Sequence, residues 1–310
     1  MTAAVHDNLA WFSARPALSV LIPFLRDDPE TLIELLDREA SRLNGAAELV
    51  LLDDGTNDLD LTRRLIARIE ASTLPIRLIS LSENEGRSVG RNRLAASARG
   101  SSLLFLDGDM RPDDDRFLTT WADLAATRDT AVAFGGFSLL QAPDDARFAV
   151  HRSMAARSDC TPREQRALQP EKHVFTSNLL VRRDVFETEA FDTGFSGWGW
   201  EDVEWAMRVS RRFKVEHIDN PATHMGLDTV DSLAAKYEQS APNFARVVAR
   251  HPDFVAAYPS YRVARRLQAV PGLKAIRPLF KQAARLPILP VALRAFSLRL
   301  YRVALYAEAI

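Results

Sequence analysis

The feature that most constrains the fold is a regular alternation of short apolar runs with longer amphipathic segments in the N-terminal third of the chain. Mostly apolar runs occupy positions 19–24, 48–52 and 76–81, the run at 103–106 is apolar throughout, and turn residues bound each of them. An uninterrupted apolar run of this length is typical of a strand buried on both faces of a sheet. The segments between the runs place leucine and isoleucine at helical spacing. This pattern predicts an α/β fold with a parallel, doubly wound sheet and right-handed crossovers.

Residues with ligand-binding capacity lie at the ends of several predicted strands. Pro23 is near the end of the first strand, Asp53 and Asp54 follow the second, and Asp107 and Asp109 follow the fourth. Ligands of open parallel sheets bind outside the carboxyl ends of the strands. We therefore expect these side chains to meet at one edge of the sheet.

The stretch Asp107-Gly108-Asp109 is the strongest single signal at that edge. Its two carboxylates could hold a divalent cation against a ligand, and the glycine permits a tight bend. The same spacing of aspartates recurs at 58–60 and 113–115, where acids at a predicted helix start complement the helix dipole. Only the first copy ends a buried strand. Taken alone, it fits either a metal site or an ordinary strand-to-loop turn.

A second signal is the segment GWGWED at residues 197–202. Acids in the first turn of a helix complement the helix dipole and need no further role to explain them. An exposed tryptophan between glycines, however, is suited to the face of a sugar, which makes Trp198 a candidate substrate contact. A carboxylate beside it could be the general base for an acceptor hydroxyl. We predict this role for Asp202, and Glu201 is either a sugar ligand or a simple helix-start acid.

His224 lies in a predicted turn at 221–226, after a strand. From there its imidazole could complete a site begun by the aspartate pair. A single histidine is more often a satisfied polar residue than a ligand, so its position alone leaves both roles open.

After Asp109 the regular alternation fades. We expect a mobile loop at 142–172, which is polar and has few apolar anchors. The other expected elements are helices at 113–126 and 201–212 and strands at 130–140, 174–181 and 214–218, the first of these strands broken by two glycines.

The order of the motifs resembles that of the family-2 inverting glycosyltransferases, which have the GT-A fold. The motifs that carry the resemblance are SVLIPF, ELVLLDDGTND, NEGRSVGRN, FLDGD, TSNLLVRRDVF and GWGWED, followed by a histidine. The last motif is similar to those of the chondroitin-polymerase type and of β-1,4-galactosyltransferases. The resemblance covers residues 17–226. It implies a GT-A catalytic domain at 17–258, after a lead-in at 1–16.

The resemblance also implies roles for individual residues toward a UDP-sugar donor and a Mn²⁺ or Mg²⁺ ion. Asp107 would contact the ribose and the metal, and Asp109 and His224 would ligate the metal at the diphosphate. Asp202 would be the catalytic base, with Glu201 and Trp198 holding the sugar. The residues implied for the uracil and ribose are Pro23, Asp53, Asp54 and Arg91.

The C-terminal segment 259–310 is strongly basic. From residue 262 onward it carries ten Lys or Arg and one acid, a local charge of +9, whereas the whole chain has a net charge of −1. Apolar residues recur at helical spacing between the cations. One interpretation is a helical subdomain packed on the catalytic domain, and another is an in-plane anchor on an anionic membrane, which we favour. Nucleic-acid binding is a third, disfavoured because the rest of the chain is acidic.

Composition limits the class of protein. Of the 310 residues, 47% are hydrophobic and 26% charged, which is ordinary for a globular protein with a sizeable core. The single Cys160 leaves no internal disulfide and no multi-cysteine zinc site. No signal peptide or run of about 20 apolar residues is visible. We expect a cytoplasmic enzyme, with peripheral contact to the cytoplasmic face of the inner membrane through 260–310.

Two further functions remain open from the residues. A sugar nucleotidyltransferase would need a glycine-rich basic loop after the first strand, where this chain has FLRD at 24–27. A catalytically silent sugar-binding protein would not need the acids that are present at 107, 109 and 202. The expected partners are a nucleotide sugar and a glycan or lipid-linked acceptor, whose identities the motifs do not specify.

Overall fold

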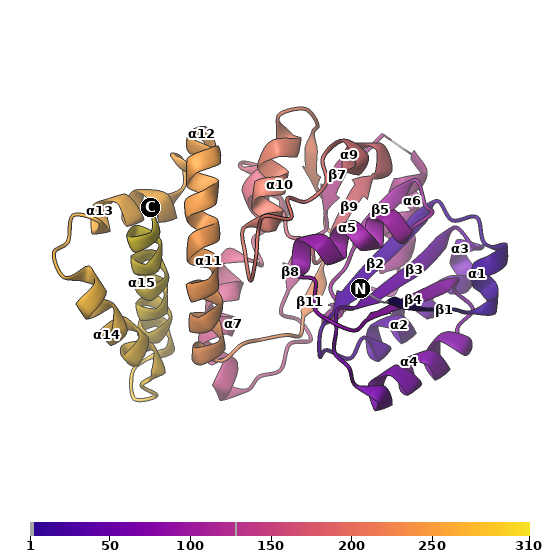
Figure 1. Ribbon diagram of the computed structural model, residues 1–310, viewed down its shortest axis with the longest axis horizontal. Coiled ribbons are helices and arrows are strands. Elements are labelled where there is room, and N and C mark those ends of the chain that lie inside the picture. Colours follow the sequence, from indigo (N-terminus) through magenta and orange to yellow (C-terminus); the bar gives the residue numbers. More distant parts are fainter. Residues whose placement is uncertain (1–2, 128) are drawn as a thin grey trace.

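The computed structural model describes residues 3–127 and 129–310. Its centre is an eight-stranded sheet in the order β1-β4-β3-β2-β5-β9-β7-β10 (Figure 1). The strands are β1 (Ala3–Asp7), β2 (Leu18–Phe24), β3 (Ala47–Asp53), β4 (Ile76–Leu81), β5 (Ser102–Phe105), β7 (Val132–Phe134), β9 (Leu179–Arg182) and β10 (Val215–His217). Strands β4, β3, β2 and β5 run parallel, as predicted from the four apolar runs. Strand β9 is antiparallel to both of its neighbours.

Helices cover both faces of this sheet (Figure 1). Those of the catalytic part are α1 (Leu9–Ser13), α2 (Glu30–Asp37), α3 (Ala40–Leu43), α4 (Leu59–Glu70), α5 (Arg87–Ser97), α6 (Phe117–Thr127), α9 (Arg183–Thr188) and α10 (Glu201–Ser210). Successive side chains of a strand point to opposite faces. Ile22 accordingly packs with α2 on one face, whereas Leu21 lies in the core with α5 and α10 on the other. This double burial explains why β2 is almost entirely apolar, with Ser19 as the one polar residue.

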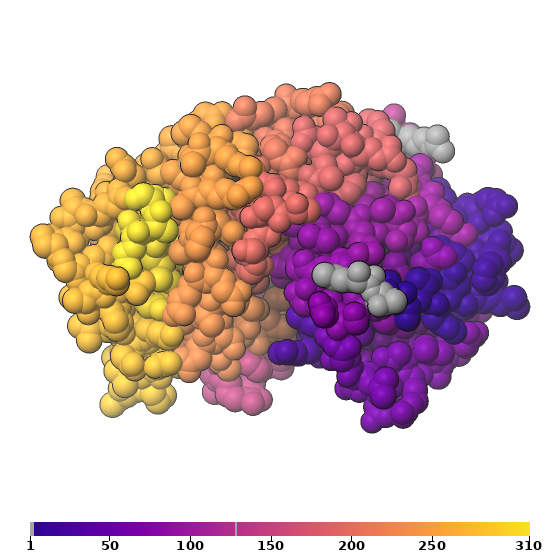
Figure 2. Space-filling model, in the orientation of Figure 1, coloured from indigo at the N-terminus to yellow at the C-terminus, as the bar shows by residue number. Residues whose placement is uncertain are grey.

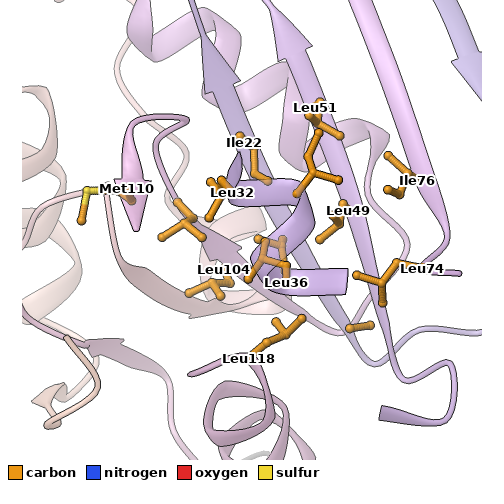
Figure 3. Packing of buried hydrophobic residues seen from close by; sticks show 14 of the residues in the cluster. Ile22, Leu32, Leu36, Leu49, Leu51, Leu74, Ile76, Leu104, Met110 and Leu118 are labelled. Carbon is orange, nitrogen blue, oxygen red and sulfur yellow. The ribbon is translucent and has the colours of Figure 1, made fainter. Parts of the chain in front are cut away.

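Figure 3 shows the core on the α2 face. Ile22, Leu49, Leu51, Ile76 and Leu104 project from the strands toward Leu32 and Leu36 of α2 and Leu118 of α6. All of these residues are at most 2% exposed. The carboxyl ends of β2, β3 and β5 are therefore held by a closely packed layer, and the loops that follow them have a rigid base.

A small second sheet has the order β6-β11-β8, formed by β6 (Met110–Pro112), β11 (Ala222–His224) and β8 (Phe137–Ser138). Strands β6 and β11 are antiparallel, and their register places His224 opposite Met110. This pairing brings the residue after Asp109 beside a histidine that is distant in the sequence.

Several expected elements differ in the structure. The lead-in at 1–16 contains β1, which extends the main sheet antiparallel to β4, and α1, whose Trp11 is buried beneath Arg99 at 3.7 Å. The expected strand at 130–140 is two short strands in different sheets. The chain passes between them at Gly135 and Gly136, and a Cβ on Gly135 would lie 2.4 Å from Asn178.

The segment at 142–172 is helical rather than a loop. It contains η1 (Ala146–Phe148), α7 (Ala149–Ser158), α8 (Arg163–Arg166) and η2 (Pro170–His173). Its few apolar residues suffice because Val150 and Met154 of α7 pack into the core formed with the C-terminal helices. The expected strand at 174–181 begins only at Leu179.

The C-terminal part is a layer of helices beside the sheet domain (Figure 1). Its elements are α11 (Val230–Arg250), α12 (Pro252–Val255), α13 (Pro259–Leu267), α14 (Leu273–Arg285) and α15 (Val291–Ala309). The buried Leu298 and Tyr301 of α15 share a core with α11 and α7. The tail therefore packs on the rest of the protein, in agreement with the first interpretation of its sequence. Among the described residues, no helix is both long enough and apolar enough to cross a membrane.

Candidate active site

Asp53 and Asp54 lie where β3 ends, as predicted, and both are nearly buried. Asp53 accepts a hydrogen bond from the backbone N–H of Thr56 at 2.8 Å. The carboxylate of Asp54 accepts bonds from the backbone N–H groups of Glu85 at 2.8 Å and Gly86 at 3.2 Å. Burial raises the pKa of Asp54, and these N–H donors oppose that shift. Asp54 thus fixes the loop that leads into α5.

Asp107 lies just past the end of β5 and has a partner for each oxygen. Arg91 of α5 donates to Oδ1 at 2.8 Å, and Ser177 donates to Oδ2 at 2.8 Å. Burial alone would raise the pKa of Asp107, but the charges of Arg91 and Arg87 outweigh it and hold the pKa below its usual value. Asp107 is therefore a fixed anion at the floor of the site.

The same two arginines bind Glu201, the first residue of α10. Arg87 donates to its Oε1 at 2.5 Å, and Nη1 of Arg91 lies 3.8 Å from the same oxygen. Burial would raise the pKa of Glu201, whereas Arg87 and Arg91 lower it. Asp107, the arginines and Glu201 form one charged network that joins β5, α5 and α10.

Asp202 follows Glu201 in the first turn of α10. Burial and the adjacent charge of Glu201 raise its pKa to about 7, against the opposing effect of Arg87. A carboxylate with this pKa can both accept and release a proton near neutral pH. Its only hydrogen bond among the described residues is from the backbone N–H of Val203 at 2.8 Å, so one carboxylate oxygen is available to a ligand.

Asp109 and His224 are in direct contact. The distance between Oδ2 of Asp109 and Nε2 of His224 is 3.0 Å. Burial would lower the pKa of His224, but the carboxylate of Asp109 raises it. The chain approaches this pair closely at Gly226, where a Cβ would lie 2.0 Å from Oδ2 of Asp109. The register of β6 and β11 thus brings together two residues that the resemblance implies as metal ligands.

The donor atoms of this pair suit a divalent cation, since Mn²⁺ and Mg²⁺ accept carboxylate oxygen and Mn²⁺ also accepts imidazole. Asp107, the other carboxylate that the resemblance implies for the metal, accepts one hydrogen bond on each oxygen, from Arg91 and Ser177. Within residues 3–127 and 129–310, no three His, Cys, Asp or Glu side chains are arranged as a metal site. Oxygens of a ligand or water would complete the coordination of a metal held by Asp109 and His224.

A cavity of about 270 Å³ opens beside Asp109. The loop after β2 contributes Asp27 and Asp28 to its lining, and the chain after β11 contributes Met225 and Gly226. Burial, followed by the charges of Asp109 and Asp107, raises the pKa of Asp27. A concentration of negative charge at a sheet edge is the environment that a cation would neutralise.

The GWGWED segment packs on α11. Trp198 is partly buried against Tyr237 at 6.2 Å, and Lys236 lies 5.9 Å from the centre of its ring. Lys236 also pairs with Asp228 at 2.6 Å. Trp200 packs instead on Phe244 and donates to the hydroxyl of Tyr306 at 3.1 Å, so it joins α10 to the C-terminal helices.

The structure thus brings most of the predicted residues to one sheet edge. Backbone N–H of Gly108 donates to the carbonyl of Pro23 at 3.3 Å, which places the ends of β2 and β5 side by side. Residues that sequence reasoning missed are Asp27, Arg87, Ser177 and Lys236. Two of them carried a usable signal, since Arg87 lies one helical turn before Arg91 and Asp27 follows a strand end on the same edge.

The sequence is similar to those of known glycosyltransferases. The model of the family "Glycosyl transferase family 2" matches residues 19–189. N-acetylglucosaminyltransferases of Bradyrhizobium elkanii and Bradyrhizobium sp. (strain ANU 289) are 30% and 31% identical over 95 and 97 residues. The matched regions are 30% and 31% of this chain and 52% and 63% of the relatives, so the likeness spans only part of those proteins.

Solved structures share the fold at low identity. A mannosyltransferase from Pyrobaculum calidifontis, in complex with GDP-Man and Mn²⁺, aligns with a TM-score of 0.57 and 14% identity over 100% of this chain and 90% of its own. TarS 1–349 of S. aureus aligns with a TM-score of 0.53 and 14% identity over 94% and 89%. The fold is therefore GT-A, as predicted. Because the family match covers more than half of its residues, the chain belongs to glycosyl transferase family 2.

Proposed function

We propose that this family-2 glycosyltransferase is metal-dependent and inverting, and that it moves a hexosyl residue from a UDP-sugar to an acceptor hydroxyl. The observation that carries the proposal is the direct contact of Asp109 with His224 at the sheet edge that also bears Asp107. The charged network of Arg87, Arg91 and Glu201 connects that edge to the helix of Asp202.

In this proposal Asp109 and His224 hold the metal, and Asp107 and Arg91 orient the ribose side of the donor. A bound divalent cation would neutralise the charge that develops on the diphosphate leaving group. Asp53 and Asp54 would contact the nucleoside at the end of β3. Trp198 and Glu201 would hold sugar faces and hydroxyls.

Asp202 acts on the acceptor. Its ionised carboxylate would accept the proton of the acceptor hydroxyl as the oxygen attacks the anomeric carbon from the side opposite the diphosphate. The bond to the diphosphate oxygen breaks in the same displacement. Configuration is inverted because no glycosyl-enzyme intermediate forms. The pKa of about 7 supports this role, because at neutral pH the group is both partly ionised and sufficiently basic.

The acceptor in this proposal is a glycan or a lipid-linked glycan, with the enzyme in the cytoplasm and its 260–310 tail in peripheral contact with a membrane. The donor nucleotide rests on the resemblance of the motifs, and GDP-Man is the donor named for the archaeal structure. A sugar nucleotidyltransferase and a silent sugar-binding protein are the competing functions.

The test is a screen of UDP- and GDP-sugars for protection against thermal unfolding, with Mn²⁺ and with chelator. A donor stabilises the native state by mass action, so the true donor raises the melting temperature only when metal is present. Transfer to oligosaccharide or lipid-linked acceptors is then measured with that donor. Protection that survives chelation would remove the metal from the proposal. Donor binding without any transfer or hydrolysis would favour a silent binding protein.

A further inference from the structure

Exposed apolar side chains concentrate on the C-terminal helices. Of the fifteen exposed large hydrophobic residues among the described ones, eight lie between 263 and 296. This stretch is 34 of the 310 residues. Scattered exposed leucines need no explanation, but such a concentration marks an interaction surface.

Helix α14 is apolar on two sides. Leu273 and Ala284 face inward and are at most 8% exposed, in the core shared with α15. Ile276 and Leu279 lie three residues apart on a second face, and they are 38% and 64% exposed. Packing on α15 therefore accounts for only one of the two apolar faces.

The connection between α14 and α15 continues the second face. Leu286 and Ile288 in the connection are 49% and 87% exposed, and Leu293 and Phe296 in the first turns of α15 are 45% and 55% exposed. Together with Leu279 these four residues form what we call the apolar tip. It lies at the end of the α14–α15 hairpin, on the side of the C-terminal helices away from the sheet domain (Figures 1 and 2).

Within the described part of the chain, cations without an acidic partner lie on the same C-terminal segment as the apolar tip, in α13 and at the start of α14. Three of the tail cations have acidic partners, in the pairs Arg277–Glu308, Lys281–Glu238 and Arg285–Asp231. In contrast, no carboxylate of the described residues pairs with the exposed Arg262, Arg265, Arg266 or Lys274. The tail as a whole retains its local charge of +9.

We propose that the apolar tip and these cations dock on an anionic membrane surface, with the hairpin lying in the interface. Apolar side chains enter the boundary between headgroups and acyl chains while arginine and lysine meet anionic headgroups. A second copy of the chain is a poorer partner, because it would bring a second charge of +9 against the first. Nucleic acid would match the cations but leave the apolar tip in water.

This inference deepens the proposed function, since it brings the site to a lipid-linked acceptor, but docking itself depends on the tail alone. The test is flotation of the full chain with vesicles of phosphatidylcholine and phosphatidylglycerol in equal amounts, and with phosphatidylcholine alone. We expect binding to the mixed vesicles that weakens with added salt. The double variant Leu279→Asp, Ile288→Asp should bind at least about tenfold more weakly.

Matched controls are available in the chain. Leu9 and Leu168 are 85% and 81% exposed outside the tail, so Leu9→Asp with Leu168→Asp should leave binding unchanged. Arg266→Glu with Lys274→Glu should weaken binding about tenfold or more, since each cation near an anionic surface contributes. The same charge change at the exposed Arg15 and Arg116 should have little effect. Circular dichroism establishes that each variant is folded.

Equal recovery of wild type and tip variants would overturn the proposal. Equal binding to neutral and anionic vesicles would also overturn it. A third contrary result is that no variant binds vesicles while light scattering shows that the wild type is a dimer and the tip variants are monomers. None of these measurements requires donor or transfer. Failure of docking is therefore distinguishable from failure of the proposed reaction, which the donor-dependent thermal shift tests separately.

Discussion

Nε of Arg87 lies 2.5 Å from Oε1 of Glu201, and this contact joins the first residue of α5 to the first residue of α10. Arg87 also lies 4.0 Å from Asp107, at the end of β5. The position of α10, and with it the position of Asp202, is therefore set by the same charges that pair with Asp107 at the sheet edge.

Breaking this contact should destabilise the protein. In Arg87→Ala the nearly buried Glu201 loses its closest cation. We expect the free energy of unfolding to fall by about 3 kcal/mol. This is the lower end of the range for a broken buried pair, because Arg87 is partly exposed. Urea unfolding followed by circular dichroism measures the change. Arg63→Ala, which breaks an exposed pair with Asp60, is the control and should cost under about 1 kcal/mol.

A double variant separates charge burial from lost packing. Glu201→Gln removes the charge that Arg87→Ala leaves unpaired, so the double variant should regain part of the lost stability. If the two single effects simply add, the network does not act as a unit and its role in placing α10 is refuted.

Asp202→Asn should strongly slow transfer while preserving the fold. Removing a general base costs about 10²–10⁴-fold in rate, and donor binding should persist because this residue acts on the acceptor. Steady-state transfer and the metal-dependent thermal shift measure the two properties. Asp60→Asn, at an exposed first-turn position of α4, should change neither. Transfer by Asp202→Asn at the wild-type rate would remove Asp202 as the base.

The same substitution should raise stability in alkaline solution. The pKa of Asp202 is about 7 in the folded protein, against a model-peptide value near 3.9 when unfolded. A raised folded pKa contributes stability that is complete below the unfolded pKa and is lost as the pH rises through 7. At pH 8 Asp202→Asn should therefore unfold at a higher temperature than wild type. At pH 4 the difference should vanish.

Activity should fall as the pH is lowered through 7. Only ionised Asp202 accepts a proton, and its raised pKa leaves the group mostly protonated in acid. With saturating metal and donor, kcat should decline about tenfold per pH unit on the acid side. A flat profile from pH 8 to pH 5 would contradict the role. The residual activity of Asp202→Asn should lack this acid limb.

His224→Ala should weaken metal binding. Loss of a residue that only supports a metal ligand reduces metal affinity by about 10–100-fold. His224 would be one of two protein ligands, so its loss should reduce Mn²⁺ affinity by more than that. Mn²⁺ titration of the thermal shift with UDP present gives the affinity. His6→Ala, on edge strand β1, is the control and should leave the titration unchanged. Wild-type affinity in His224→Ala would exclude the histidine as a ligand.

The sequence was informative wherever a local pattern decided the structure. Strands β2 to β5 could be predicted because burial on both faces leaves mostly apolar runs. The short strands β7 and β8 could not, since a glycine pair divides them between two sheets. Helix α7 was missed because its stability comes from packing on α15, a contact that no local pattern encodes.

The same distinction applies to the site. Asp107 and Asp109 were predictable because they end a buried strand. The contact of Asp109 with His224 follows from the pairing of β6 with β11, which sequence spacing does not reveal. Arg87 was missed because a charge at a helix start usually faces solvent, and Ser177 because a single serine before a strand carries no distinctive signal.

The pairing of β6 with β11 has a consequence for biosynthesis. Met110 and His224 are opposite one another although 113 residues separate them along the chain. As the ribosome releases the polypeptide, β2 to β5 can assemble before His224 has been made. If Asp109 and His224 hold a metal as proposed, that site cannot form until the chain has been synthesised through His224.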